Sequence, residues 1–317
     1  MNERYEVVVV GGGAAGLSGA LTLSRARRSV LVVDSGSPRN APADGVHAYL
    51  GHEGTPPEKL LAVGRAEVAG YGGEFVTGEV VSAERLDGGG FRVVLGDGSA
   101  VRADRLLVTT GLVDELPDVP GLAERWGHDV LHCPYCHGWE VRDQAIGVLA
   151  TGPLGVHQAL MWRQWSGDVK LFTHTAPELT AGDREQLAAR DITVVEGRVT
   201  GVRVGDDRIA GLELADGRVV DCHAVAITSR MTARAGMLAA LGLEAADLER
   251  DGHVVGSHVP ADPTGATSVA GVWVAGNVAN PLEQVIGSAA AGVKAGAAIN
   301  ADLIAEETRR AVAARRG

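Results

Sequence analysis

The sequence predicts an α/β protein with two Rossmann-like, three-layer nucleotide-binding domains, the second inserted into the first. Residues 7–10 form a short β-branched run that leads through a glycine turn into a helix-like segment. A second strand–turn–helix pattern begins at residues 145–149, and a late apolar strand at residues 272–275 precedes a helix of small residues. Two such units in one chain indicate a repeat of architecture without close repetition of sequence.

Hydrophobic runs and turn residues predict the elements of the first domain. Short β-branched runs predict buried parallel strands, and segments with helical spacing between them predict the covering helices. The turn Gly96-Asp97-Gly98 predicts a strand on either side. In chain order we expect strand 7–10, helix 17–27, strand 30–33, a loop-rich region 36–57, helix 59–71, strands 91–95 and 100–107, and a strand end at 106–108.

A shift in composition at residues 117–120 predicts the crossing into the second domain. Its expected elements are strand 145–149, helix 157–165, strand 169–173 and a strand pair around residues 215–217. The chain is expected to return near residue 245 and to end with strand 272–275 and helix 288–298. We therefore assign residues 1–115 and 245–317 to the first domain and residues 116–244 to the second.

Composition and charge exclude several classes of protein. The chain has 317 residues, of which 45% are hydrophobic and 44 are glycines, which suits tight turns and close backbone approaches. Its net charge of −11 would repel a polyanion such as a nucleic acid. The basic side chains near the end indicate a solvated helix end; they are Arg309, Arg310, Arg315 and Arg316. No run is long and apolar enough for a membrane span or a signal peptide, so we expect a cytoplasmic protein.

The first glycine turn is typical of a dinucleotide site. Gly11-x-Gly13-x-x-Gly16 stands between a strand and a helix. Gly11 permits the sharp turn, Gly13 lets a pyrophosphate approach the helix N-terminus, and Gly16 lets helix and strand pack closely. Asp34, at the end of the next strand, can accept hydrogen bonds from a ribose hydroxyl. A glycine turn with a merely structural role is the alternative interpretation.

A close cysteine pair indicates redox chemistry. Only two residues separate Cys133 from Cys136, so the sulfurs can close a disulfide, and we expect the start of a helix there, where the dipole would stabilise a thiolate. A zinc site is the alternative, but the adjacent His132 and His137 would make a cramped tetrahedral set. Three cysteines are too few for a disulfide scaffold. We expect the third, Cys222, to be buried and inert.

A late motif points to the cofactor. Residues 267–276 read T-S-V-A-G-V-W-V-A-G and are followed by Asn277. This resembles the late FAD motif of two-domain flavoprotein disulfide reductases, in which an acidic residue usually follows the glycine and binds the ribityl chain. The amide of Asn277 can still hydrogen-bond a hydroxyl. Residues 281–285 are then expected to bring a helix N-terminus near the flavin ring, and FAD is the expected cofactor.

From the first glycines to the last helix, the chain resembles the low-molecular-weight thioredoxin reductase family. The resemblance implies a homodimer in which the cysteine pair of the second domain exchanges electrons with FAD of the first. It also implies that Cys136 faces the flavin and that Cys133 meets the substrate. Together with the motifs, it assigns cofactor binding to Gly11, Gly13, Ala14, Ala15, Gly16, Asp34, Arg39, Asn40, Thr110, Gly111, Gly276, Asn277, Gln284 and Val285.

The residues beside the cysteines depart from that family. An aspartate usually follows the second cysteine as the catalytic acid, whereas here His137 follows it and His132 flanks the other side. This departure resembles the dithiol oxidases that close disulfides in holomycin, gliotoxin and romidepsin biosynthesis, and it implies that these histidines shuttle protons. A histidine can do so near neutral pH because its unperturbed pKa is about 6.5. A packing or capping role is the alternative for both.

The second glycine turn lacks parts of a nicotinamide site. Ala150 stands where the first glycine is expected and Pro153 lies inside the loop, so only Gly152 and Gly155 remain. Residues 173–176 read T-H-T-A where the reductase family carries paired arginines for the 2′-phosphate of NADPH. A threonine and a mostly neutral histidine do not replace two guanidinium groups. We therefore expect NADPH binding to be weak or lost.

These observations predict a FAD-dependent dithiol oxidase of antibiotic-type biosynthesis. A small-molecule dithiol would reduce the cysteine pair, the pair would reduce FAD, and O2 would take the electrons to give H2O2. One alternative is a disulfide reductase supplied by NADPH or a ferredoxin, and another is a non-catalytic flavin-binding redox sensor. The intact cysteine pair with two histidines argues against the sensor. The altered second turn argues against NADPH but leaves ferredoxin open.

Overall fold

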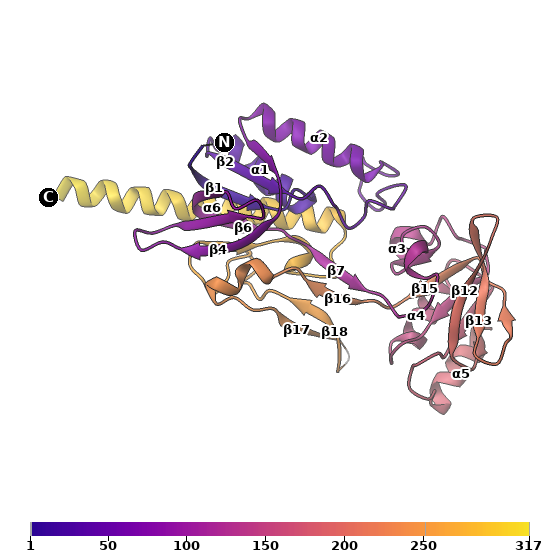
Figure 1. Cartoon of the computed structure of the whole chain (residues 1–317). Helices are drawn as coiled ribbons and strands as arrows, with labels where there is room; N and C mark the ends of the chain where they lie inside the picture. The colour runs from indigo at the N-terminus through magenta and orange to yellow at the C-terminus, as the bar shows by residue number, and fades with distance from the viewer. Residues whose placement is uncertain (1, 251, 317) are drawn as a thin grey trace. The chain divides into compact units, whose positions relative to one another are not determined.

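The computed structural model describes residues 2–250 and 252–316, which fold into two compact units (Figure 1). Unit 1 takes the described residues of Met1–Ala41, Thr55–Val113 and Met231–Gly317, and unit 2 takes Pro42–Gly54 and Asp114–Arg230. Unit 1 contains a mostly parallel sheet with an antiparallel edge, unit 2 contains a parallel sheet, and helices cover both. The predicted α/β fold class with two Rossmann-type domains is confirmed.

A seven-stranded sheet forms the centre of unit 1. Its strands are β1 (Arg4–Val10), β2 (Val30–Asp34), β3 (Glu74–Thr77), β4 (Val80–Arg85), β5 (Phe91–Leu95), β6 (Ala100–Val108) and β19 (Val272–Val274). They lie in the order β3-β2-β1-β6-β5-β4, with β19 beside the end of β6. Val10 pairs with Val33 in parallel register, so Gly11, which follows β1, lies beside Asp34, the last residue of β2.

The two faces of this sheet are covered differently. Side chains alternate along a strand, and Val7 and Val9 of β1 pack toward the helices α1 (Ala14–Arg25) and α6 (Val285–Arg316). Val8 and Val10 pack on the opposite face, with the short helix η2 (Gly236–Leu241). The helix α2 (Pro57–Gly70) lies against α1. The sheet of unit 1 therefore lies between a layer formed by α1 and α6 on one face and η2 on the other.

The last helix is much longer than the sequence pattern predicts. We expected residues 288–298, whereas α6 spans 32 residues, a length of about 48 Å. The first half of α6 consists mainly of small and apolar residues and packs on α1. The last turns of α6 extend past the sheet (Figure 1), and their side chains are exposed. Arg310 pairs there with Glu306, in keeping with a solvated helix end.

Unit 2 is built on a five-stranded parallel sheet in the order β11-β10-β9-β15-β8. Its strands are β8 (Val130–Leu131), β9 (Ile146–Leu149), β10 (Val169–Phe172), β11 (Thr193–Val195) and β15 (Ala224–Ile227). The helices are α3 (Pro134–His137), α4 (Gly155–Trp162) and α5 (Ala181–Ala189). A second, three-stranded sheet comprises β12 (Val199–Gly205), β13 (Arg208–Leu214) and β14 (Val219–Val220).

The chain passes between the units through two neighbouring strands. β7 (Leu112–Glu115) and β16 (Arg230–Ala233) belong to a four-stranded sheet with β17 (Ala246–Arg250) and β18 (His253–His258). We expected the return to the first domain near residue 245, but Met237 and Leu238 already lie in the core of unit 1. The described helices, in residues 2–250 and 252–316, include none that is long and apolar enough to span a membrane.

Candidate functional site

The first glycine turn has the geometry that its sequence predicts. Gly11 has a φ of +103°, and a Cβ built there would lie 2.4 Å from the carbonyl oxygen of Thr109. A Cβ at Gly16 would lie 1.9 Å from the carbonyl oxygen of Gly11. The hydroxyl of Thr109 donates to that same Gly11 oxygen at 2.8 Å. Only glycine therefore fits at either position, because the turn, α1 and the end of β6 are in direct contact.

Gly13 faces open space at the start of α1. It is the N-cap of that helix, and within the described chain no side chain caps the helix. A Cβ at Gly13 finds no neighbouring atom of the described residues within 4 Å. The amides of the first turn, including those of Ala14 and Ala15, have no partner in the preceding turn of helix. Free amides at the positive end of a helix bind an anion, so this turn fits a pyrophosphate.

Asp34 is held at the edge of this turn by two partners. The amide of Gly12 donates to its Oδ1 at 2.9 Å, and Arg65 of α2 forms an ion pair with its Oδ2. Arg65 also lies 5.6 Å from the ring centre of Phe75. A carboxylate has about four lone-pair positions, so Asp34 can still accept a ribose hydroxyl. Sequence reasoning missed Arg65, which no local motif distinguishes.

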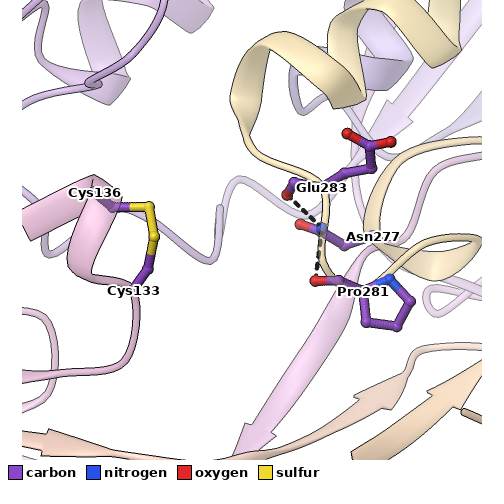
Figure 2. Close-up of a disulfide and its surroundings, with 5 residues drawn as sticks. All are labelled: Cys133, Cys136, Asn277, Pro281 and Glu283. Atoms are coloured by element: carbon purple, nitrogen blue, oxygen red, sulfur yellow. Dashed lines mark hydrogen bonds between the residues drawn. A yellow bond between two sulfur atoms is a disulfide. The ribbon is translucent and has the colours of Figure 1, made fainter. Parts of the chain in front are cut away.

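The late motif lies against the first one. Gly276 has a φ of +73°, and a Cβ there would lie 2.9 Å from the Cβ of Ala15. The side-chain amide nitrogen of Asn277 donates to three backbone carbonyls of the following loop, which belong to Asn280 at 3.2 Å, Pro281 at 3.2 Å and Glu283 at 2.9 Å. Figure 2 shows the bonds to Pro281 and Glu283. An aspartate at this position could not make these bonds, because a carboxylate is only an acceptor. Asn277 thus orders the loop and keeps its oxygen available for a hydroxyl.

The other predicted cofactor residues also fall in unit 1. Thr110 donates its hydroxyl to the carbonyl oxygen of Arg234 at 2.7 Å. Gly111, with a φ of +71°, accepts the amide of Arg234 at 3.0 Å. Both residues therefore fix the end of β6 to the returning chain. The remaining four are Arg39 and Asn40 in the loop after β2, and Gln284 and Val285 at the start of α6.

Cys133 and Cys136 form a disulfide in unit 2, with their Cα atoms 5.3 Å apart (Figure 2). Cys133 is the N-cap of α3, and its carbonyl oxygen accepts the amides of Cys136 and His137, both at 3.1 Å. We expected a helix whose dipole stabilises a thiolate. α3 has only four residues, so few peptide dipoles are aligned and this stabilisation is small.

His137 ends α3 and is partly buried. Burial lowers the pKa of its imidazole from the ordinary value; the nearby charges of Glu140 and Asp44 raise that pKa, and the imidazole of His47 lowers it. The His137 ring is therefore neutral near pH 7. A neutral imidazole beside a disulfide can take the proton of an incoming thiol.

Aromatic rings surround the disulfide loop. His132 stacks on Trp126, with ring centres 5.6 Å apart and planes inclined by 28°. Tyr135, between the two cysteines, meets Trp165 edge to face at 5.4 Å. The stacking gives His132 a packing partner, so the alternative of a packing role has a structural basis, and its role in proton transfer stays a prediction.

The loop Pro42–Gly54 folds with unit 2, although we assigned residues 1–115 to the first domain. Its His47 contacts Glu53 of the same loop and Glu140, which follows α3. A Cβ at Gly127 would lie 2.6 Å from the Cβ of Pro42, which shows how closely the loop packs on this unit. Sequence reasoning missed His47 and its carboxylates. A lone histidine in a loop carries no local signal of tertiary contact.

The second glycine turn has an alanine in place of its first glycine, whereas a Cβ at its second glycine, Gly152, would meet no described atom within 4 Å. Ala150 is buried, and a Cβ at Gly155 would lie 2.4 Å from the Cβ of Ala150. After β10, His174 has a φ of +43° and its Nδ1 accepts the amide of Val199 at 3.1 Å. Burial, and then the charge of Arg198, lower the pKa of His174. His174 is thus a neutral, engaged group rather than a phosphate clamp.

Cys222 has the environment that its sequence context predicts. It is a free, fully buried cysteine of unit 2. Burial raises the pKa of its thiol to about 12. A thiol that stays protonated is a poor nucleophile, which leaves Cys133 and Cys136 as the candidate redox cysteines.

Known proteins resemble this chain along most of its length. The chain matches the pyridine nucleotide-disulphide oxidoreductase family over residues 5–296. It is 31% identical to the thioredoxin reductase tcpT of Claviceps purpurea over 314 residues, which cover 95% of each chain. It is also 31% identical to the thioredoxin reductase aclD of Aspergillus oryzae over 241 residues, 72% of this chain and 76% of that one.

Solved structures agree with these relatives. HlmI superposes with a TM-score of 0.91 at 48% identity, covering 99% of this chain and 97% of the other. An oxidoreductase from Agrobacterium tumefaciens superposes with a TM-score of 0.87 at 34% identity, covering 95% and 99%. The resemblance to thioredoxin reductase-like enzymes is therefore confirmed. With its paired glycine turns and its Cys133–Cys136 disulfide, the chain is a member of the pyridine nucleotide-disulphide oxidoreductase family.

Proposed function

We propose that the protein is a FAD-dependent dithiol oxidase, which forms a disulfide in a small-molecule dithiol and passes the electrons to O2. One observation carries this proposal: an intact Cys133–Cys136 disulfide with a neutral histidine beside it occurs together with an altered second dinucleotide turn. Electrons can then enter from a thiol more easily than from NADPH. We also propose, from the family resemblance, that the protein is a homodimer.

The residues of unit 1 fit FAD. The open space at Gly13 and the free amides of α1 suit the pyrophosphate, and Asp34 suits the ribose. The oxygen of Asn277 suits a ribityl hydroxyl, because its nitrogen is engaged by the loop. Bound there, FAD would supply the two-electron chemistry that links the cysteine pair to O2.

The cysteine pair carries out two exchange reactions. A substrate thiolate attacks the sulfur of Cys133, the S–S bond breaks, and Cys136 leaves as a thiolate. The second substrate thiolate then attacks the substrate sulfur that is bound to Cys133, which closes the product disulfide and releases Cys133. One S–S bond forms for each that breaks, and the two electrons reside on the cysteine pair. The overall reaction converts R(SH)2 and O2 to RS2 and H2O2.

His137 is the acid–base group of this proposal. A thiol must lose its proton before it attacks, because the thiolate is the nucleophile. Burial keeps the pKa of the His137 imidazole low, so at pH 7 it is ready to accept that proton. The same group can return the proton to the sulfur of Cys136, which lies one residue before it.

Two features of the second turn support thiol-driven rather than NADPH-driven reduction. Ala150 stands in the place that Gly11 has in the first turn but lacks its positive φ, so the sharp glycine turn of a dinucleotide site is not repeated here. His174 supplies no positive charge near neutral pH, because burial lowers the pKa of its imidazole. Its Nδ1 atom is also engaged, since it accepts the amide of Val199. A site for the 2′-phosphate of NADPH needs guanidinium or ammonium groups in a fixed arrangement.

A disulfide reductase is the second candidate, because relatives such as tcpT and aclD are named thioredoxin reductases. Anaerobic mixing separates the two. Dithiothreitol should bleach the flavin absorbance of the protein within seconds, whereas NADPH should not. In air, an oxygen electrode should record O2 uptake and H2O2 formation with dithiothreitol alone. NADPH-dependent reduction of a disulfide without thiol-driven O2 uptake would establish the reductase instead.

A further inference from the structure

The helix that carries the disulfide, α3, is too short to keep its shape without support. It has four residues. The carbonyl oxygen of Cys133 accepts the amides of Cys136 and His137 at 3.1 Å, and that of Pro134 accepts the amide of Gly138 at 2.7 Å. Isolated helices shorter than about 12 residues are marginal in water. The disulfide braces this turn while it is closed, so after its reduction the turn depends on packing.

Trp165 supplies that packing. A Cβ on Gly138 would lie 2.8 Å from both Cγ and Cδ2 of the Trp165 indole, so the bare backbone of Gly138 lies directly on the ring. The ring of Tyr135 meets the same indole edge to face, with centres 5.4 Å apart and planes inclined by 90°. Two residues of the disulfide turn are therefore in contact with one tryptophan.

The Trp165 contact and the disulfide lie on different faces of α3. Residues three or four apart on a helix share a face. Cys133 and Cys136 are three apart and are both partly exposed, whereas Pro134 and Gly138 are four apart and are both buried. Trp165 thus supports the turn from its buried side, and the face with the two cysteines is not covered by this contact.

Trp165 is itself held firmly by unit 2. Its amide donates to the carbonyl oxygen of Trp162, the last residue of α4, at 2.9 Å, and its own carbonyl oxygen accepts the amide of Asp143 at 2.9 Å. The hydroxyl of the buried Ser166 donates to the carbonyl oxygen of Gln144. The indole lies 6.3 Å from the ring centre of Trp162, which is fully buried. The support therefore belongs to the core of the unit.

Such a support affects the equilibrium between disulfide and dithiol. Two thiols close a disulfide more readily when they are held near the bridging distance, because the effective concentration of one at the other is then high. A turn without support gains conformational freedom once the S–S bond is broken, and this entropy favours the dithiol. A rigid partner on the buried face of α3 limits that freedom and thus favours the disulfide.

We propose that Trp165 is a positioning residue for the redox pair: its indole keeps α3 in one shape in the disulfide and dithiol states, and so sets the reduction potential of Cys133–Cys136 and the rate at which the pair passes electrons on. The proposal rests on the thiol–disulfide exchange in the proposed function. It does not depend on whether O2 or another acceptor finally takes the electrons.

The first test is the equilibrium of the FAD-loaded protein with glutathione, without oxygen. Two glutathione thiols reduce the protein disulfide to two thiols and form one glutathione disulfide. Alkylation followed by mass spectrometry measures the free thiols of Cys133 and Cys136. In Trp165→Ala the pair should be easier to reduce, with an equilibrium constant changed by about three- to tenfold, the range for loss of an aromatic pair. Tenfold corresponds to a rise in potential of about 30 mV. Trp165→Phe keeps a ring beside Gly138 and should stay near the wild type.

A second variant removes the same contact from the side of α3. The Tyr135 side chain is 64% exposed, so Tyr135→Ala leaves the core untouched and serves where Trp165→Ala does not fold. Its potential should shift in the same direction, and the double variant should shift by less than the sum, because both changes remove one contact. Trp139→Ala is the matched control. Trp139 is 66% exposed and its ring lies 4.1 Å from the guanidinium of Arg142, so the wild-type potential should be kept.

The rate of flavin reduction by dithiothreitol, measured by stopped flow without oxygen, is a readout that a merely structural role would not move in this way. The reduced pair closes its disulfide again when it passes its electrons to the flavin. A lower effective concentration of the thiols should therefore slow this step in Trp165→Ala by about threefold or more, although the pair itself is easier to reduce. Trp139→Ala should reduce its flavin at the wild-type rate.

Each outcome decides the proposal. Unshifted potentials in Trp165→Ala and Tyr135→Ala, a shift that makes the pair harder to reduce, or an equal shift in Trp139→Ala overturns the positioning role. If the potentials shift as expected but dithiothreitol drives no O2 uptake by the wild type, the positioning role stands and the oxidase proposal fails. If O2 is taken up while the potentials are unshifted, the oxidase stands and the positioning role fails. If neither glutathione nor dithiothreitol reduces the wild-type pair, both proposals fail.

Discussion

Gly276, in the loop after β19, lies directly against Ala15 in the first turn of α1, where a Cβ on Gly276 would stand 2.9 Å from the Cβ of Ala15. This contact joins the late motif to the first glycine turn, although they are at opposite ends of the sequence. The free amides of α1 and the oxygen of Asn277 are thereby brought to the same part of unit 1. The five predictions that follow test this site, the disulfide, the histidine beside it and the packing that supports them.

Gly13→Val should lose most of the bound FAD. The branched side chain would enter the space beside α1, where a Cβ finds no atom of the described chain within 4 Å, so the fold is kept while the pyrophosphate is displaced. Flavin absorbance per mole of purified protein measures the loss. Gly70→Ala, which also meets no described neighbour within 4 Å, is the control and should keep its flavin. Full FAD content in Gly13→Val would contradict the proposed site.

Cys133→Ser and Cys136→Ser should each abolish dithiol oxidation, because the exchange needs both sulfurs. Cys133→Ser should leave a thiolate at Cys136 that gives a charge-transfer band with FAD. Steady-state O2 uptake and the visible spectrum check the two results. Cys222→Ala is the control and should retain activity, since burial raises the pKa of that thiol to about 12. Turnover at the wild-type rate in either serine variant rules out the disulfide mechanism.

His137→Ala should slow flavin reduction by dithiothreitol by about 10²–10⁴-fold, the range for loss of a proton-transfer group. FAD content should stay normal, and His128→Ala on the surface should behave as wild type. Because burial lowers the pKa of His137, the neutral base persists below the ordinary histidine value of about 6.5. The wild-type rate should therefore fall only as the pH drops through that lowered pKa. A loss below about threefold would return His137 to a structural role.

The free energy of unfolding should depend on pH through the same titration of His137. The unfolded chain binds a proton on His137 below pH of about 6.5, whereas the folded chain resists it until the lowered pKa is reached. Stability is therefore fully present above the unfolded value and is lost as the pH falls from there to the folded pKa. His137→Ala should reduce this loss, which urea unfolding between pH 5 and 7 would detect. An unchanged pH dependence would show that His137 is not buried as described.

Gly292→Ala should destabilise the protein by about 1–3 kcal/mol or more, because its Cβ would lie 2.0 Å from the carbonyl oxygen of Ala15 and α1 and α6 would have to separate. Thermal unfolding measures the effect, and Gly152→Ala, with no described neighbour within 4 Å, is the control. We also expect weaker FAD binding, since Ala15 belongs to the first turn of α1. A melting temperature equal to that of the control would show that the helices are packed less closely than described.

Local sequence patterns were sufficient for the fold class and for several elements. The strand at residues 91–95 is predicted with the bounds that β5 has, because a turn with two glycines limits it on one side. The glycine turn is also predictable, since the spacing Gly11-x-Gly13-x-x-Gly16 between a strand and a helix is itself a local pattern. Helix ends were less predictable: α1 begins at Ala14 rather than residue 17, because its N-cap is a glycine without a capping side chain.

The sequence by itself determined the chemistry that is available: a dinucleotide turn, a late flavin-type motif and a cysteine pair close enough to bridge. Only the tertiary structure decided which side chains from other parts of the chain contact the residues of these motifs. Arg65 reaches Asp34, and His47 reaches Glu140, through contacts between segments far apart in the chain. The folding of the loop Pro42–Gly54 with unit 2 has the same cause. Such contacts depend on how layers pack, a long-range property that periodicity and turn residues do not encode.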